Sequence, residues 1–184
     1  MKIYEEYAAW WPLLSDPSEY EDEADFFREA IAAHTKRPTH TVLDLGSGTG
    51  NVASHLKSHY TLTLTDISEK MLDVSRGINS RSEHIAGDMR TLRLGKTFDA
   101  VFVHDAVMYM TTRDDLRRAI ETARRILVVR AKASISLEPR ASATSAARPR
   151  FQGLSADCAD LRRLRLSVVF LSHRWGAVQA LSSA

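Results

Sequence analysis

Five consecutive residues, Gly46-Ser47-Gly48-Thr49-Gly50, constrain the fold of this chain more than any other part of its sequence. They follow a short, mostly apolar run from Thr41 to Leu45 and precede a segment from about Asn51 to Ser58 with helical spacing. We therefore expect a buried strand, a glycine turn and a helix in that order. Glycines let the backbone turn sharply and approach a ligand closely, and the start of a helix offers free N–H groups. The pattern is GxGxG rather than the GxGxxG of dinucleotide-binding proteins, which disfavours a nicotinamide or flavin cofactor.

The same alternation of strand and helix patterns continues along the chain. Further strands are expected at residues 61–66, 84–86 and 98–103. Helices are expected after Ser18, which with Glu21 fits a capping box, after Ser68, and from Thr112 through Leu127. Such alternation predicts an α/β fold with a parallel-rich sheet and helices on both of its faces.

Two acidic residues end successive strands on the edge of the sheet that carries the glycine turn. Asp66 follows Gly46 by 20 residues, where a carboxylate can accept hydrogen bonds from both hydroxyls of a ribose. Asp88 ends the next strand after Gly87 and can accept from an exocyclic amine such as that of adenine. Each acid could instead cap a turn, which is a common role for Asp.

Four motifs in order resemble the class I S-adenosylmethionine-dependent methyltransferases of small-molecule type. They are 42–50 (VLDLGSGTG), 66–72 (DISEKML), 87–90 (GDMR) and the stretch from Phe98-Asp99-Ala100-Val101 to Tyr109-Met110. The resemblance covers residues 1–123 and implies a Rossmann-like fold, S-adenosyl-L-methionine as cofactor and methyl transfer to a small-molecule substrate.

The resemblance also implies roles for individual residues. Gly46, Gly48 and Gly50 would line the methionine part of the cofactor together with Ser47, and Asp44 would reach its amino group through water. Asp66 would hold the ribose hydroxyls and Ile67 would lie against adenine, whose amine Asp88 would accept while Met89 packs on the ring. His104 and Asp105 would face the transferred methyl group.

A sulfonium methyl group is already activated, so the protein chiefly aligns the acceptor and excludes water. A base is needed only where the acceptor must lose a proton, and His104 or Asp105 could serve. Both could instead shape a polar loop at the strand end. An aromatic cluster near the N-terminus, in residues 1–38, is open to two interpretations as well: Tyr4, Tyr7, Trp10 and Trp11 could form a lid over the cofactor or dock on the helix layer.

The last third of the chain departs from this pattern. Residues 1–123 hold 14 basic and 20 acidic residues, a net charge of −6, whereas residues 124–184 hold 11 and 3, a net charge of +8. Arg, Ala and Ser dominate the second part, and no glycine or proline marks a turn before Pro139. We interpret 124–184 as an atypical basic tail, produced by a shifted reading frame or by replacement of the original tail, in which the C-terminal strands of the sheet are missing or replaced. The strand at 98–103 would then be an exposed edge.

Composition excludes several other classes. The lone Cys158 rules out an internal disulfide and a multi-cysteine metal site, and no metal site is predicted. No apolar stretch is long enough for a membrane span, and the acidic start predicts a cytoplasmic protein. Two alternatives to an active methyltransferase stay open: a cofactor-binding but catalytically inactive protein, and nucleic-acid binding through the basic tail. The latter is disfavoured because aromatic residues there are scattered.

Overall fold

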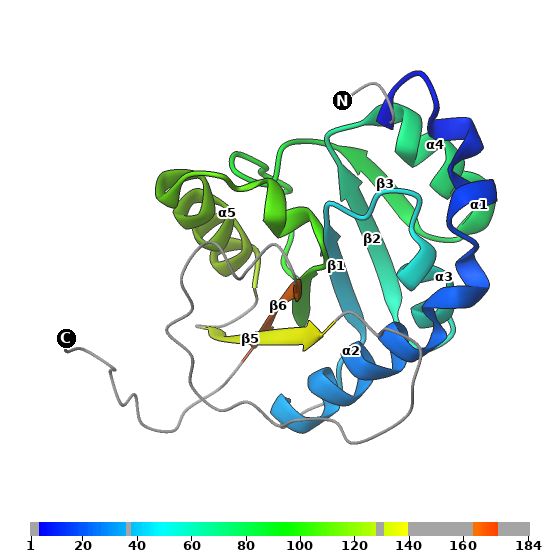
Figure 1. Cartoon of the computed structure of the whole chain (residues 1–184). Helices are drawn as coiled ribbons and strands as arrows, with labels where there is room; N and C mark the ends of the chain where they lie inside the picture. The colour runs from blue at the N-terminus through cyan, green and yellow to red at the C-terminus, as the bar shows by residue number, and fades with distance from the viewer. Residues whose placement is uncertain (1–3, 36–37, 128–130, 140–163, 173–184) are drawn as a thin grey trace.

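The computed structural model describes residues 4–35, 38–127, 131–139 and 164–172. Figure 1 shows a central sheet with helices packed against it and the N-terminal segment running along one side. The helical elements are the 3-10 helices η2 (Ala8–Trp10), η3 (Pro17–Tyr20) and η4 (Ala106–Tyr109), and the α-helices α1 (Trp11–Leu14), α2 (Glu21–His34), α3 (Asn51–Leu56), α4 (Glu69–Ile78) and α5 (Arg113–Ile126). The strands are β1 (Thr41–Leu45), β2 (Thr61–Asp66), β3 (Glu83–Ala86), β4 (Ala100–Val103), β5 (Ala131–Pro139) and β6 (Leu164–Ser172).

The strands form one sheet in the order β3-β2-β1-β4-β6-β5. The four strands from the first two thirds of the chain are parallel, with Val42 opposite Leu62 on one side and opposite Ala100 on the other. This arrangement confirms the predicted parallel-rich α/β sheet. The carboxyl ends of these strands meet at one edge, so the glycine turn, Asp66 and the segment after β4 are brought together.

Two separate apolar cores cover the two faces of the sheet, because successive side chains of a strand point to opposite faces. Val42 packs with Phe27 and Ile31 of α2 and with Leu56 of α3 in one core. Its neighbour Leu43 belongs to the other, which is closed by α5. That second core comprises Leu43, Leu45, Leu92, Phe98, Val101, Val103, Val107, Ala123, Ile126 and Leu127. The prediction of helices on both faces is therefore confirmed.

Two of the three predicted helix caps are confirmed. The hydroxyl of Ser68 accepts from the Met71 amide at the start of α4, and that of Thr112 accepts from the Asp115 amide at the start of α5. The capping box at Ser18 was wrong: α2 begins at Glu21 with no side-chain cap. Asp16 instead accepts from the Ser18 amide at 2.8 Å, because a 3-10 turn intervenes between that segment and α2.

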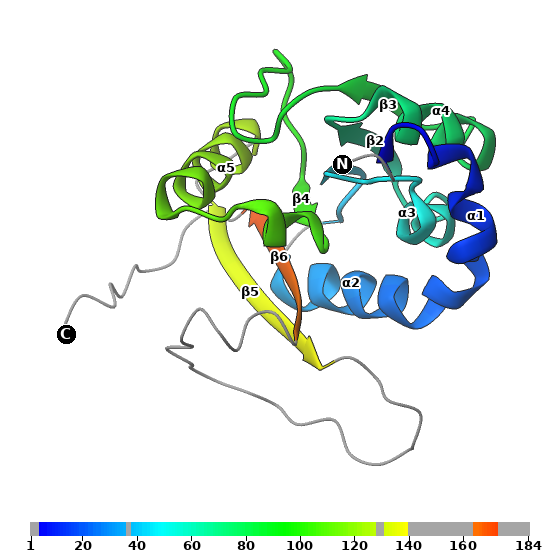
Figure 2. The same cartoon turned by 45° about the horizontal axis from the view of Figure 1, so that its top comes forward.

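The last third of the chain corrects two expectations. β4 is not an exposed edge, because Ala100–Val103 pairs antiparallel with residues 168–171 of β6. β5 then pairs antiparallel with the outer side of β6, as Figure 2 makes visible. The second correction concerns α5, which ends at Ile126, while Leu127 forms a parallel bridge with Phe98. A signal for β5 is present in the alternation Ala-Lys-Ala-Ser-Ile-Ser-Leu, which requires no glycine turn before it.

Candidate functional site

The glycine turn after β1 adopts backbone conformations that side chains other than glycine disfavour. Gly46, Gly48 and Gly50 have φ angles of 81°, 56° and 70°. A Cβ on Gly46 would overlap the Cβ of Ala106 and lie 2.9 Å from the Cε of Met89. A Cβ on Gly48 would meet only the Cε of Met71, at 3.5 Å. Gly46 is therefore required by packing inside the protein, whereas the surroundings of Gly48 leave room for a ligand.

Gly50 is the N-cap residue of α3 and has a left-handed backbone conformation. Its carbonyl is hydrogen-bonded by a residue at the end of α4. The buried amide of Asn79 donates from Nδ2 to the Gly50 carbonyl oxygen at 2.9 Å and to Ser75 Oγ at 3.3 Å. A Cβ on Gly50 would lie 2.5 Å from that Nδ2 and 2.6 Å from that Oγ. The sequence analysis did not single out Asn79 or Ser75, since nothing local marks a helix end as the support of a distant turn.

Asp66, at the end of β2, is bonded to the glycine turn itself. One carboxylate oxygen accepts from the Gly48 amide at 2.9 Å and the other from the Ser68 amide at 2.8 Å. Burial raises the pKa of Asp66 above its usual value, and these two backbone bonds offset only part of that rise. The adjacent Ile67 is 71% exposed, so its apolar side chain is open to a flat ligand. The structure thus brings Asp66, Ile67 and Gly48 together.

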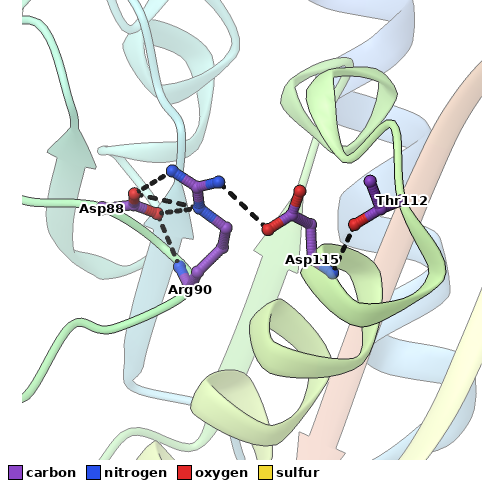
Figure 3. Close-up of polar contacts among 4 residues, drawn as sticks. All are labelled: Asp88, Arg90, Thr112 and Asp115. Carbon is purple, nitrogen blue, oxygen red and sulfur yellow. Dashed lines mark hydrogen bonds and ion pairs between the residues drawn. The ribbon is translucent and has the colours of Figure 1, made fainter.

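Asp88, just beyond β3, has an immediate partner that the sequence analysis missed. Arg90 donates to its carboxylate from the backbone amide, from Nε and from Nη2, and donates from Nη1 to Asp115 of α5 at 3.0 Å (Figure 3). These bonds with Arg90 hold the pKa of Asp88 below its usual value. Met89, between the two residues, is partly buried against the α5-side core and lies next to Gly46.

Asp44 lies within β1 and is only 2% exposed. Its pKa is raised to about 8, mainly by burial, with a smaller lowering contribution from His104 and a smaller raising contribution from Asp66. Within the described part of the chain, Asp44 Oδ1 and Ser47 Oγ are buried atoms without a hydrogen-bond partner. A ligand with polar hydrogens beside the glycine turn would supply what these two atoms lack.

His104, just past β4, lies beside an acid that the sequence analysis did not identify. Its Nε2 lies 2.9 Å from Oε2 of Glu23 in the first turn of α2, and both side chains are 13% exposed. Asp105 Oδ2 lies 3.7 Å from the same nitrogen. The ring of Phe27 packs edge-on against the imidazole, with centroids 5.4 Å apart. His104 and Asp105 are therefore close together, with a second carboxylate beside them.

The N-terminal segment reaches across this edge of the sheet. The Tyr4 carbonyl accepts from Ser68 Oγ, and its hydroxyl is hydrogen-bonded to that of Tyr109 in η4. Burial, then the bond with Tyr109, raises the pKa of Tyr4. Tyr4 also packs on Trp11, with ring centroids 5.5 Å apart, whereas Tyr7 and Trp10 are mostly exposed. Of the four aromatic residues, Tyr4 is the one bonded to segments that follow both β2 and β4.

These residues fit S-adenosylmethionine. The open face of Gly48 and the unpaired buried atoms of Asp44 and Ser47 suit the amino-acid part of the cofactor. Asp66 and Ile67 offer an acceptor and an apolar surface side by side, as a ribose and its base require. No helix in the described ranges is long and apolar enough to cross a membrane.

Comparisons with known proteins agree with this geometry. A family model described as a methyltransferase domain matches residues 42–129. Demethylmenaquinone methyltransferase of Thermotoga maritima is 28% identical over 131 residues, which cover 69% of this chain and 56% of that protein. The chain spans about half the length of the curated relatives it matches.

Solved structures show the same fold. The S-adenosylmethionine-bound amino pentose methyltransferase CalS10 of Micromonospora echinaspora is 24% identical, with a TM-score of 0.58 over 65% of this chain and 57% of that one. The N-methyltransferase NodS of Bradyrhizobium japonicum WM9 is 18% identical, with a TM-score of 0.59 over 87% of this chain and 99% of that one. Residues 42–129 thus match a methyltransferase domain, and the chain has the fold of S-adenosylmethionine-dependent methyltransferases, as the sequence motifs predicted.

Proposed function

We propose that this chain transfers a methyl group from S-adenosylmethionine to a small-molecule amine at the carboxyl edge of the parallel strands. The observation that carries the proposal is the bond from the Gly48 amide to Asp66. Asp66, which would be the ribose-binding carboxylate, lies against the glycine turn at Gly48, where the turn has room for a ligand, and this supports the proposal.

Each part of the cofactor has candidate residues. Gly46, Ser47, Gly48 and Gly50 would line the methionine part, and Asp44 would bind its amino group through water. Asp66 would accept from the ribose hydroxyls. Ile67 and Met89 would contact the adenine ring, whose amine would be accepted by Asp88.

Bound S-adenosylmethionine supplies a methyl group on a positively charged sulfur, which is already a good leaving group. The protein then has to hold the acceptor in line and exclude water. Carboxylates of Glu23 and Asp105 near His104 favour an acceptor that arrives as an ammonium ion. His104 would accept the proton that this ammonium must lose before its nitrogen can attack. Tyr4 would cover the site from the N-terminal side.

Calorimetric titration of the whole chain with S-adenosylmethionine and with its demethylated product, S-adenosylhomocysteine, tests the proposal. We expect saturable binding of both that Asp66→Ala abolishes. Asp73→Ala is the control, because Asp73 is an exposed acid paired with Arg76 on α4. A folded protein that binds neither compound would contradict the proposal. Binding without methyl transfer to a panel of amines would identify a cofactor-binding but inactive protein.

Nucleic-acid binding through the basic tail is the remaining alternative. Most of residues 124–184 lie outside the described residues, as does Cys158. Salt-sensitive retention on DNA would support this alternative.

A further inference from the structure

Arg90 lies between two carboxylates that belong to different elements. On one side its Nε donates to both oxygens of Asp88 at 3.0 Å, its Nη2 donates to Oδ2 at 2.5 Å, and its backbone amide donates to Oδ1 at 2.8 Å. On the other side its Nη1 donates to Asp115 Oδ1 at 3.0 Å. Figure 3 shows the guanidinium spanning the space between the end of β3 and the start of α5.

This arrangement fixes the direction of the Asp88 carboxylate. A guanidinium is planar, and a fork that bonds both oxygens holds the plane of the carboxylate as well as its position. The far end of Arg90 is itself anchored, because the Asp115 amide donates to the capping hydroxyl of Thr112 at 3.1 Å. Asp88 is therefore oriented by the start of a helix, not only by its own turn.

The charges keep Asp88 a hydrogen-bond acceptor. The hydrogen bonds from Arg90 are the main cause that lowers the pKa of both Asp88 and Asp115. One guanidinium between two ionised carboxylates leaves the trio with a net negative charge. The three side chains are 36%, 23% and 22% exposed for Arg90, Asp88 and Asp115, and ion pairs at such partly exposed positions contribute little to stability. The main effect of this geometry is therefore to orient the ionised carboxylate of Asp88, rather than to stabilise the fold.

We propose that Arg90 is a positioning residue of the adenine subsite: with Asp115 behind it, it orients the Asp88 carboxylate so that the subsite discriminates a purine carrying a 6-amino group from one without it. The inference rests on the proposed function and deepens it, because it makes base selectivity depend on α5. Neither Arg90 nor Asp115 needs to touch the cofactor.

The test is a comparison of two dissociation constants measured on the full chain by calorimetry. The probes are S-adenosylhomocysteine and the same compound lacking the 6-amino group. We expect the unsubstituted protein to bind the second compound about tenfold more weakly, the effect of one hydrogen bond to a charged acceptor. Arg90→Lys keeps the charge but loses the planar fork, and we expect the ratio to fall to about threefold or less. Asp115→Asn, which leaves the backbone cap on Thr112 intact, should lower the ratio in the same direction.

Arg76→Lys is the matched control, since Arg76 also bonds two carboxylates, Glu69 and Asp73, but within α4. It should leave the ratio unchanged. A purely structural role for Arg90 would lower the thermal midpoint of Arg90→Lys without changing the ratio, and that result would overturn the inference. Equal binding of the two compounds by the unsubstituted protein would overturn it too, while leaving the proposed function standing. If Arg90→Lys does not fold, Asp115→Asn decides. Failure to bind either compound would overturn the proposed function along with the inference.

Discussion

At the scale of single residues, the acids at the carboxyl edge of the sheet lie in three different electrostatic environments. Asp44 is buried within a strand, Asp66 accepts from two backbone amides, and Asp88 is bonded to a guanidinium. The pKa of Asp44 is accordingly raised and that of Asp88 lowered, for reasons that lie in burial and in the nearest partner. Acids of one chemical type can therefore meet the different parts of one ligand.

Replacement of Asp44 by asparagine tests its buried protonation. The folded protein keeps a proton on Asp44 up to its pKa of about 8, whereas the unfolded chain releases it near pH 4. Between these values the folded state binds the extra proton, so this residue makes the free energy of unfolding fall as the pH rises. Asp44→Asn removes the effect. Urea unfolding from pH 5 to pH 8 should show the variant gaining on the unsubstituted protein by up to about 1.4 kcal/mol per pH unit. A difference that does not change with pH would contradict this assignment.

Two glycine substitutions should have opposite effects on stability. Gly46→Ala places a Cβ against Ala106 and Met89 at a φ of 81°, and we expect a loss of about 2 kcal/mol or more. Gly77→Ala, in α4, meets no atom within 4 Å and should stabilise the helix by about 0.5–1 kcal/mol. Urea midpoints of the two variants provide the comparison. Equal effects would mean that the conformation of the turn is unimportant.

The sequence predicts the residues of the site that are adjacent to a strand end, and misses those that reach it through the fold. Asp66 and the glycines can be found because the position of each is defined by its own strand. Glu23 and Arg90 cannot, because their partners His104 and Asp115 come from other elements. No local pattern in α2 distinguishes Glu23 from its acidic neighbours.

At the scale of elements, the N-terminal segment is hydrogen-bonded at both of its ends, to the site at Tyr4 and to α3 further along the chain. Asn51 Nδ2 donates to the Ser15 carbonyl at 3.1 Å, and His55 Nε2 bonds the Pro17 carbonyl at 2.7 Å. The first helical turns are thus tied down at one end, while Tyr4 bonds Ser68 and Tyr109 at the other. These contacts favour a lid role for Tyr4. They do not support one for Tyr7 and Trp10, whose side chains are exposed.

Removal of one hydroxyl tests the lid. Tyr4→Phe loses the bond with Tyr109 but keeps the ring that packs on Trp11. If the segment retains the cofactor, bound S-adenosylhomocysteine should leave several times faster, which stopped-flow displacement measures. Tyr7→Phe changes an exposed ring and should leave the rate as it is. An unchanged rate in Tyr4→Phe would mean that the segment only packs.

The start of α5 offers a second test at this scale. Thr112→Ala removes the hydroxyl that accepts from the Asp115 amide and should cost about 1 kcal/mol. Thr111→Ala, one residue earlier, changes a residue whose backbone amide alone is bonded and should cost much less. Thermal or urea unfolding of the pair gives the difference. Equal losses would argue against the cap.

Elements between Thr41 and Ile126 can be predicted from sequence because caps, glycine turns and apolar spacing agree there. The position of β6 between β4 and β5 cannot. A strand can pair with any free edge of a sheet, and nothing in the sequence of residues 98–103 indicates which later strand will pair with them.

At the scale of the whole molecule, charge and fold divide the chain at different places. The net charge changes sign near residue 123, whereas α5 continues to Ile126 and the family match to residue 129. The origin of residues 124–184 in a shifted reading frame stays a prediction. Translating the other two frames of the gene across codons 118–130 tests it: a frame that encodes a glycine turn followed by a strand would support it.

Truncation tests the contribution of β6. A chain that ends at residue 139 lacks the strand that pairs with β4, and we expect the exposed edge to cause self-association. A chain that ends at residue 172 keeps β6 and should sediment as the full chain does. Analytical ultracentrifugation distinguishes the two. Identical sedimentation of all three would show that β4 does not need β6 for protection.

Because β4 pairs with β6, a strand much later in the chain, β4 is synthesised well before its partner strand. Sixty residues lie between Val103 and Leu164, so a ribosome adding about 5–20 residues per second takes about 3–12 s to complete the distance. For that interval the nascent chain presents an apolar strand whose permanent neighbour does not yet exist. Slower translation lengthens the interval. Holdase chaperones that bind extended apolar segments reduce the aggregation that the exposed strand would otherwise cause. The yield of soluble protein should therefore depend on elongation speed and chaperone supply as well as on the stability of the finished fold.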